Sequence, residues 1–579
     1  MAALKFSPVE NPGKLGSYWK RQWKTVMVIT VSGLLFNGCM SIGPILQGTL
    51  IDAIVSKQPL RAILLQTGLF TGAILLIQIM RFIKRYYVRV FANRTSAAMR
   101  MMIYNDIMNR DIMDLSREST GDLMTKSVSD VDICVEGMRK VTTEVFDTGV
   151  LMLSYLVSLF VYDWKITLAA CAFIPVAMWL AERLKKVIAG FSKEARTQSS
   201  RVSDITYDNI EHTVLFRVNG LEGKSRQAYF SELEEQETRS VKANILENSM
   251  QPVYNVIASL GIVAVLYYGG RNVIESVWTV GMFSTFCILF IALTTKASKA
   301  AKLFNSFQKA AVSWQRIKPY FADYKKKSTA DRGLHGDGRL TVKDLGFHYP
   351  EKTELVVQHI SFTAGPGEWI GVTGPVACGK SSLGTALQGL YPYLGSIVLD
   401  GVELRDYSEA ELARRVSWLG HSPQLLSDTI YRNITLGEDG DISRVLSDVC
   451  FDEDMKSMPE GVQTVVGNSG VRLSGGQQAR IALARTLYRP GLLMILDDPF
   501  SAVDMRTEEM IIENLRRYYP ERIVVLISHR LTAFPQTDRV IVLHSDRKAE
   551  YGTHSSLMSS SERYQAVYRL QTGGNDEKT

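Results

Sequence analysis

The residues with the clearest chemistry form a glycine-rich loop that follows the apolar run Ile370–Thr373. The loop reads GPVACGKS over residues 374–381 and fits the spacing G-x-x-x-x-G-K-[ST]. Between a strand and a helix, the backbone N–H groups of such a loop surround phosphate oxygens. Lys380 would reach the β- and γ-phosphates of a nucleotide, and Ser381 would offer its hydroxyl to Mg²⁺. We therefore expect this loop to bind a nucleoside triphosphate.

Shorter motifs follow the phosphate loop in the same half of the chain. LSGGQ at residues 473–477 precedes a helix-like stretch, Gln478–Leu487, and glycines at a helix start make an anion site. The apolar run from Leu493 ends in Asp497, the Walker B arrangement for holding Mg²⁺. SAVD at 501–504 and ISH at 527–529 come next. Taken singly, an aspartate after a strand is usually a helix cap and a lone histidine is usually structural. In this order, the motifs together favour a nucleotide site.

The chain changes character near its middle. Of its 579 residues, 46% are hydrophobic and 22% are charged, an average typical of a soluble protein, yet the long apolar runs lie in about the first 300 residues. From about Gly333, short β-rich runs alternate with glycine turns and helical stretches, as in an α/β domain. The length exceeds what one compact core holds. We expect a cytosolic lead-in over 1–24, a transmembrane domain over 25–320, a nucleotide-binding domain over 333–570 and a polar tail over 571–579.

The apolar runs come in pairs, each pair joined by a short polar tip. A membrane span needs roughly 20 apolar residues, or fewer if its helix continues into water. The alternative interpretation is a set of buried helices in a large soluble protein. The pairing favours six spans, at Thr25–Val55, Ala62–Met80, Val141–Tyr162, Ile166–Leu180, Val253–Tyr268 and Val280–Thr295.

The long connections between the spans are basic. Arg81–Lys140 and Ala181–Met250 are polar, helix-friendly and rich in Lys and Arg, which places them in the cytosol with the N-terminus. A helical hairpin of that length projects about 40 Å from the bilayer. Basic flanks of this kind also account for the net charge of +7 without a nucleic-acid patch. The six cysteines form no CxxC or CxxH, so neither a zinc site nor a disulfide framework is expected.

A few polar residues lie in or near the predicted spans. Polar groups in hydrocarbon are costly unless they face protein or water. These residues are Asn37, Gln47, Gln78, Glu144 and Asp147. They indicate either a polar translocation cavity or helix-end and stalk positions. The helix-end and stalk interpretation is favoured for Glu144 and Asp147.

Taken together, the motifs and spans resemble the ATP-binding-cassette transporters over nearly the whole chain. The resemblance is to a half-transporter of the exporter type, with an α-helical transmembrane domain of six spans and long cytosolic helical extensions fused to an α/β P-loop ATPase domain. It implies ATP and Mg²⁺ as cofactors. It also implies that two cassettes close head-to-tail on two ATP molecules, so that one chain cannot complete a site.

Individual positions match the motifs of that family. Tyr349 matches the aromatic residue that stacks on adenine, Asp497 the magnesium acid, and His529 the switch histidine near the γ-phosphate. Asp504 matches the D-loop. The phosphate loop is matched by Gly374, Gly379, Lys380, Ser381 and Ser382, and the signature that caps the γ-phosphate in the opposite subunit by Ser474, Gly475, Gly476 and Gln477.

Three positions depart from the family pattern. Asp498 stands where a Glu acts as general base, and the missing methylene shortens its reach by about 1 Å when a base must lie about 3 Å from its proton. We expect slow hydrolysis at this chain's own site; the alternative is that Asp498 works through an extra water. His421 holds the Q-loop glutamine position, with Gln424 three residues later as the alternative. Ala377 replaces a usual Gly and resists positive φ.

These departures, beside an intact signature, resemble the arrangement of heterodimeric exporters. We expect a non-identical second half-transporter as partner, in a bacterial inner or plasma membrane, and amphipathic drugs or lipids as substrates. The alternatives are a dedicated exporter of a peptide, thiol or haem-related compound, and a regulatory half that does not transport. Coupling between the domains is expected where the cytosolic hairpins turn, near Asp111–Leu115 and Ile210–Val218.

Overall fold

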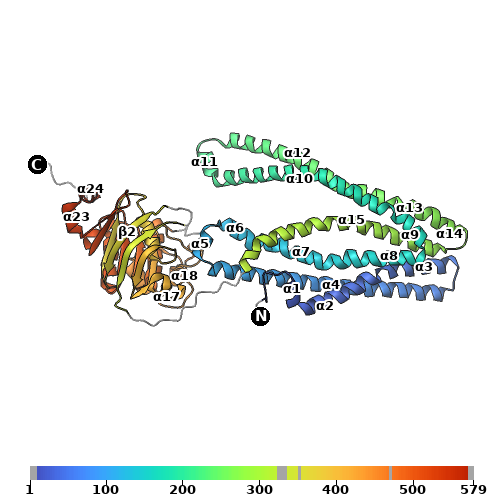
Figure 1. The fold of residues 1–579 in the computed structure, drawn as a ribbon, viewed down its shortest axis with the longest axis horizontal. Coiled ribbons are helices and arrows are strands. Elements are labelled where there is room, and N and C mark those ends of the chain that lie inside the picture. Colours follow the sequence, from blue (N-terminus) through green and yellow to red (C-terminus); the bar gives the residue numbers. More distant parts are fainter. Residues whose placement is uncertain (1–8, 322–335, 350–353, 468–472, 572–579) are drawn as a thin grey trace. The chain divides into compact units, whose positions relative to one another are not determined.

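The fold consists of two units in a computed structural model that describes residues 9–321, 336–349, 354–467 and 473–571. The first unit comprises Met1–Asn109 and Glu118–Tyr324, and the second comprises Arg110–Arg117 and Lys325–Thr579. Figure 1 shows the first unit as long helices and the second as a sheet domain surrounded by short helices. The helical membrane domain and the α/β domain predicted from the sequence are therefore confirmed as fold classes.

The helices of the first unit follow the apolar pattern closely. Five helical segments are long and apolar enough to cross a membrane, at Trp23–Val55, Leu60–Asn109, Thr120–Tyr162, Glu222–Ile274 and Val280–Ala297. The fourth predicted span, Ile166–Leu180, overlaps the apolar helical stretch Trp164–Ala177, and the side chain that follows this stretch lies outside the described residues. Among the residues described, five of the six predicted spans thus meet the standard of length and composition, and the fourth is described only in part and stays a prediction.

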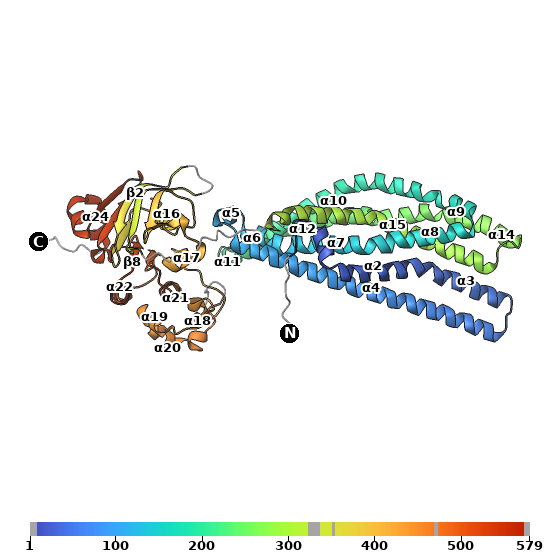
Figure 2. The ribbon, with the colours of Figure 1, turned by 60° about the horizontal axis from the view of Figure 1, so that its bottom comes forward.

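Several helices continue well beyond the apolar stretches, as the basic connections predict. The elements are α1 (Gly16–Arg21), α2 (Trp23–Gly38), α3 (Ile42–Val55), α4 (Leu60–Asn109), α6 (Thr120–Thr125), α7 (Val131–Glu144), α8 (Leu151–Tyr162), α9 (Trp164–Cys171), α10 (Phe173–Glu211), α11 (Thr213–Val218), α12 (Glu222–Ser259), α13 (Gly261–Ala264), α14 (Gly270–Ile274) and α15 (Val280–Ile317). π-helical turns interrupt them at Lys126–Asp130, Val145–Val150 and Val265–Gly269. In both ribbon views α10 and α12 run side by side, joined by the short α11 (Figures 1 and 2).

Two glycines allow α3 and α15 to pack at close range. A Cβ added to Gly281 would lie 2.1 Å from the carbonyl oxygen of Gly48, so only glycine fits this crossing. The carboxylate of Asp52 then accepts hydrogen bonds from the backbone N–H of Gly281 and the hydroxyl of Thr279, each at 2.7 Å. The start of α15 is therefore held against α3 by both shape and a hydrogen-bonded cap.

The second unit contains two sheets. A four-stranded antiparallel sheet has the order β2-β1-β4-β5, and a six-stranded sheet has the order β10-β9-β3-β8-β7-β6. In the larger sheet, β9, β3, β8, β7 and β6 are parallel, and β10 is antiparallel to β9. The strands are β1 (Leu340–Phe347), β2 (Val357–Ala364), β3 (Trp369–Thr373), β4 (Leu394–Leu399), β5 (Val402–Glu403), β6 (Val416–Leu419), β7 (Leu493–Asp497), β8 (Ile523–Ile527), β9 (Arg539–Leu543) and β10 (Ala549–Gly552).

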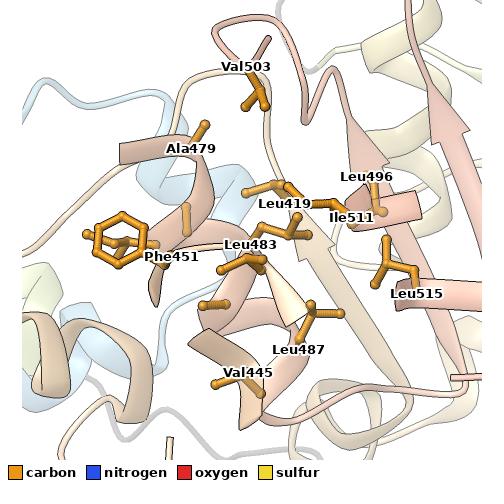
Figure 3. Close-up of a cluster of buried hydrophobic side chains, with 14 of the residues drawn as sticks. Leu419, Val445, Phe451, Ala479, Leu483, Leu487, Leu496, Val503, Ile511 and Leu515 are labelled. Carbon is orange, nitrogen blue, oxygen red and sulfur yellow. The ribbon is translucent and has the colours of Figure 1, made fainter. Parts of the chain in front are cut away.

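Short helices complete the second unit. They are α5 (Ile112–Ser116), α16 (Lys380–Leu387), α17 (Glu409–Arg415), α18 (Ile430–Thr435), α19 (Ser443–Asp448), α20 (Asp452–Ser457), α21 (Gly475–Tyr488), α22 (Met505–Tyr518), α23 (His554–Ser560) and α24 (Glu562–Gln571). Figure 3 shows the core that positions two of them: Leu483 and Leu487 of α21, with Ile511 and Leu515 of α22, gather around Leu496 of β7. The apolar strand that ends in Asp497 is therefore fixed by the same side chains that hold the signature helix.

Truncation of this core should destabilise the second unit. Leu483 is 1% exposed, so Leu483→Ala leaves a cavity that costs about 2–5 kcal/mol. The control is Leu570→Ala, because Leu570 is 83% exposed on α24. We expect a lowered midpoint of thermal unfolding for Leu483→Ala and an unchanged one for Leu570→Ala. Equal midpoints for the two variants would contradict this description of the core.

Candidate nucleotide-binding site

The candidate site lies at one edge of the parallel sheet. Because β3, β6, β7 and β8 run parallel, their carboxyl ends meet at this edge, where ligands of α/β folds bind. The segments that leave these ends carry Gly374, His421, Asp498 and His529. Residues more than a hundred positions apart in the chain are thereby brought together.

The phosphate loop is held open by three residues with positive φ. These are Gly374 at 149°, Ala377 at 64° and Gly379 at 101°. Ala377 thus adopts the left-handed conformation that its methyl group disfavours, at a cost of about 1–2 kcal/mol. The Nζ of Lys380 donates to the carbonyl oxygens of Gly374 and Pro375, at 2.9 and 2.7 Å. The ammonium therefore spans the loop in which phosphate oxygens would lie.

The two predicted magnesium ligands face each other. The hydroxyl of Ser381, at the start of α16, is hydrogen-bonded to the carboxylate of Asp497, at the end of β7, and burial raises the pKa of Asp497. A hydroxyl and a carboxylate are the hard oxygen ligands that Mg²⁺ prefers, and this ion usually completes its shell with water and phosphate. In the part of the chain that the structure describes, no cluster of three or more His, Cys, Asp and Glu side chains could hold a metal. The donor set therefore fits Mg²⁺ bound together with a nucleotide.

Asp498 lies at the centre of a small polar cluster. Its side chain is only 6% exposed, and its Oδ2 lies 2.9 Å from Nδ1 of His529 and 3.5 Å from Nδ1 of His421. The hydroxyl of Ser528 approaches the other carboxylate oxygen, Oδ1, at 3.3 Å. Both imidazoles are more than half exposed. The carboxylate is therefore turned toward protein groups.

The two candidates for the Q-loop position, His421 and Gln424, lie in different surroundings. His421 lies beside Asp498, whereas Gln424 is exposed and its main-chain carbonyl accepts a hydrogen bond from Arg485 at 2.8 Å. The imidazole of His421 is thus the side chain from this loop that faces the carboxylate, and the assignment of the Q-loop position to His421 or Gln424 stays a prediction.

Tyr349 and Ser382 are joined to each other. The hydroxyl of Ser382, which is buried, lies 3.3 Å from the hydroxyl of Tyr349. The ring of Tyr349 packs edge-on against Phe347, with 5.1 Å between ring centroids. The hydrogen bond from Ser382 therefore anchors Tyr349, the predicted adenine-stacking residue, next to the phosphate loop.

The signature residues form the start of helix α21. Ser474 accepts a hydrogen bond from the backbone N–H of Gln477, and the side-chain oxygen of Gln477 accepts one from the backbone N–H of Ser474, at 3.3 and 2.9 Å. This capping box holds an exposed helix start, with Ser474 and Gly475 both at the surface. A Cβ on Gly476 would lie 2.7 Å from the carbonyl oxygen of Ala502. The second glycine of the signature therefore leaves room for this close approach of the backbone.

Asp504 has a similar local role. Its Oδ1 accepts a hydrogen bond from the backbone N–H of Thr507 at 3.0 Å and caps α22. The hydrogen bonds from Thr507 lower the pKa of Asp504. Asp504 follows Ala502, whose carbonyl oxygen lies against Gly476 at the start of the signature helix, and its D-loop role stays a prediction.

Sequence reasoning missed two residues of the site. Ser528 contacts Asp498, and Asp454 accepts a hydrogen bond from the side chain of Gln477 at 2.8 Å. Ser528 could have been found, since it directly precedes His529 at the end of an apolar strand. Asp454 lies 23 positions before Gln477 in a short helix, and no spacing rule connects the two.

The comparisons with known proteins agree with this geometry. The family model for the ABC transporter transmembrane region matches residues 26–296, and the model for the ABC transporter ATP-binding region, described as "ABC transporter", matches residues 357–501. Both occur in one chain, in the order of the two units. The chain belongs to the ABC transporter family. It is therefore a multi-pass membrane protein with an ATP-binding domain, and ATP is the nucleotide expected at Lys380.

Individual relatives match the ABC transporter chain over almost its full length. It is 25% identical over 571 residues to the multidrug resistance-like ATP-binding protein MdlA of Escherichia coli, covering 96% of each chain. It is 26% identical over 572 residues to the ATP-dependent lipid A-core flippase of Thiobacillus denitrificans, covering 96% of this chain and 98% of the relative. It is also 26% identical over 573 residues to the probable multidrug resistance ABC transporter ATP-binding/permease protein YheI of Bacillus subtilis, covering 96% and 97%.

Removal of the loop lysine should weaken ATP binding by this ABC transporter without unfolding it. The Nζ of Lys380 contacts only carbonyls of its own loop among the described residues, so Lys380→Ala removes phosphate binding and little core packing. Binding of a fluorescent ATP analogue should weaken at least tenfold, an order of magnitude set by lost charge-assisted hydrogen bonds. The control is Lys343→Ala on the exposed face of β1. Unchanged ATP affinity in Lys380→Ala would refute the assignment of this loop.

Proposed function

We propose that this chain is one half of an ATP-driven exporter that moves amphipathic small molecules, such as drugs or lipids, by alternating access. ATP would close two cassettes, the helical extensions would transmit the closure, and hydrolysis would reset the assembly. The fusion of membrane helices to an ABC transporter domain supports this proposal. The relatives carry the names of multidrug resistance proteins and of lipid A-core flippases, which supports the substrate class. The N-terminus and the ATPase domain would be cytosolic, in a bacterial inner or plasma membrane.

We further propose that the ATP site built on this chain's own Walker motifs hydrolyses slowly. The observation that carries this proposal is the environment of Asp498, whose carboxylate lies against His529 and Ser528. A general base must accept a proton from water within about 3 Å. Asp498 is one methylene shorter than glutamate and its two oxygens already face donors, so an attacking water competes with protein groups for it. This site would hold ATP more than it cleaves it.

The signature of this chain is intact, which points to a division of labour. Ser474 and Gln477 form a complete capping box, and the exposed start of α21 offers backbone N–H groups to an anion. On a second, non-identical half-transporter with a glutamate base, this signature would complete a competent site. The proposed assembly is therefore a heterodimer with one slow and one fast ATP site.

The turns of the cytosolic hairpins are the proposed coupling elements. Helix α5, capped by Asp111, belongs with the nucleotide unit. Helix α11 at the other turn exposes Val214, Leu215 and Val218 to solvent. Apolar side chains gathered at the tip of a long hairpin favour docking against another protein surface, and a cassette is the surface that this proposal assigns to them.

Replacement of Asp498 by the longer glutamate should raise the rate of ATP hydrolysis. Asp498→Glu adds the methylene that brings the carboxylate within reach of water, and general-base catalysis is worth about 10²–10⁴ in rate. We expect ATP turnover by the purified single chain to be low, and to rise at least about tenfold in Asp498→Glu. The control is Asp546→Glu in an exposed turn. Fast turnover by the wild-type chain, unchanged in Asp498→Glu, would contradict the slow-site proposal.

Loss of the exposed apolar tip should uncouple transport from ATP hydrolysis. The double variant Val214→Ala with Val218→Ala removes apolar contact area from α11 without touching the nucleotide site. ATP binding should persist while ATP-driven uptake of a fluorescent amphipathic dye into inverted vesicles falls severalfold. Val241→Ala, an exposed valine on the shaft of α12, is the matched control. Full transport by the double variant would show that α11 is not a coupling element.

A further inference from the structure

A charged cluster lies among the membrane helices, away from the nucleotide site. It joins Asn37 of α2, Lys84 of α4 and Asp147 of the π-helical turn Val145–Val150. Asp147 lies sixteen residues from the polar tip at Asp163, or about 24 Å of helix at 1.5 Å per residue, which places it inside a core of about 30 Å and nearer to its opposite face. Ionisable groups inside the hydrocarbon are costly, and π-helical turns frequently occur at functional sites.

The positive charge of the cluster is covered. Lys84 is only 2% exposed, and its Nζ is paired with Oδ1 of Asp147. The same Nζ lies over the rings of Phe36 and Phe146, at 5.9 and 5.6 Å from their centroids. Lys84 is therefore enclosed by one carboxylate and two aromatic faces, and a ligand entering from outside would not meet its charge first.

The negative charge of the cluster is accessible. The side chain of Asp147 is 37% exposed, and both of its donors, from Lys84 and Asn37, reach Oδ1. Within the described residues no hydrogen-bond donor reaches the other oxygen, Oδ2. One turn earlier, Glu144 accepts a hydrogen bond from the hydroxyl of Thr148 at 2.8 Å and adds a second carboxylate. Lys296 of α15 is the further positive charge that acts on Lys84.

Asn37 adds an acceptor without a donor. It is fully buried, and its Nδ2 donates to the carbonyl of Gly33 at 3.0 Å and to Asp147 at 3.1 Å. Since both neighbours of Nδ2 are oxygens, the orientation of the amide is fixed. Its Oδ1 is buried and has no partner among the described residues. A buried acceptor left without a donor is unfavourable, and a ligand that supplies an N–H group would satisfy it.

We propose that Asp147, Asn37 and Glu144 form a binding site for the cationic group of an amphipathic substrate, with Lys84 as a fixed counter-ion. This inference rests on the proposed export function and narrows its substrate class. The accessible groups are carboxylate oxygens, which attract ammonium-like cations and repel anionic headgroups, and the buried amide of Asn37 holds the carboxylate of Asp147 in place. Lys84 holds the carboxylate in place through their ion pair while its own charge stays enclosed. The apolar part of the substrate would lie among the surrounding membrane helices.

A pair of probes that differ only in charge tests this site. Tetraphenylphosphonium and tetraphenylborate have nearly the same size and shape and opposite charge. Their binding to the full-length protein, in the assembly in which it is purified and in lipid nanodiscs, is measured by equilibrium dialysis without ATP. Each variant is compared with wild type for the same probe, because the two ions partition differently into lipid.

The first variant removes both charges together, Lys84→Met with Asp147→Asn, so that no unpaired charge stays buried. We expect at least tenfold weaker binding of tetraphenylphosphonium and undiminished binding of tetraphenylborate. The matched control is Lys126→Met with Asp122→Asn, an ion pair of 2.8 Å on the cytosolic extension. It should bind both probes as wild type does.

The second variant exchanges the charges, Lys84→Asp with Asp147→Lys, and keeps an ion pair if the neutral pair fails to fold. It should bind tetraphenylborate more tightly and tetraphenylphosphonium more weakly than wild type. Wild-type affinity for the cation in either variant, no cation binding by wild type, or equal loss of both probes would overturn the site. Since the measurement needs no ATP, these results leave the export proposal standing, which fails instead if no ATP-driven transport occurs.

Discussion

The carboxylate of Asp498 is the constraint on which the account of the nucleotide site depends. It emerges at the end of β7, directly after the magnesium acid Asp497, and packs against Ser528 and His529 at the end of β8. The parallel pairing of β7 with β8 fixes this meeting point, because Asp497 is in register with Ile527. The buried core under α21 and α22 fixes β7 in turn. The carboxylate of Asp498 is therefore held in place by protein groups.

The two units divide the work of such a transporter in physical terms. In the nucleotide unit, motifs cluster where parallel strands end and where helices begin, since those positions present N–H donors and carboxylates to phosphate and Mg²⁺. In the membrane unit, glycines permit close crossings such as that of Gly48 with Gly281, Asp52 caps the start of α15, and Asp147 pairs with Lys84. Among the acids at strand ends, Asp498 departs from the residue type that the family resemblance implies, while the signature at Ser474 keeps its full capping box.

Much of this arrangement could be predicted from the sequence because it is local. The phosphate loop, the acid at the end of β7 and the signature helix each occupy a short stretch with fixed spacing, and their positions at strand ends followed. Ala377 was expected to resist positive φ, yet it adopts 64°, since the surrounding glycines and Lys380 set the path of the loop. The contact of Asp498 with His529 joins strands that are neighbours only in the folded sheet, so no spacing could reveal it.

The contacts of the cluster formed by Asn37, Lys84 and Asp147 could not be predicted from the sequence for the same reason. Lys84 falls just inside a basic stretch that the sequence assigns to the cytosol, and Asp147 was favoured as a helix-end or stalk residue. The two lie 63 positions apart and meet because α2, α4 and the π-helical turn pack together.

The central claim, that the ATP site on this chain's Walker motifs holds its nucleotide largely uncleaved, is tested most directly by trapping. The working assembly is photolabelled with azido-ATP that carries its label on the γ-phosphate, under turnover and with vanadate, and labelled peptides are mapped. The account predicts that γ-label stays on peptides around Lys380 and is lost from the partner's phosphate loop. Equal loss of γ-label from both loops would contradict it.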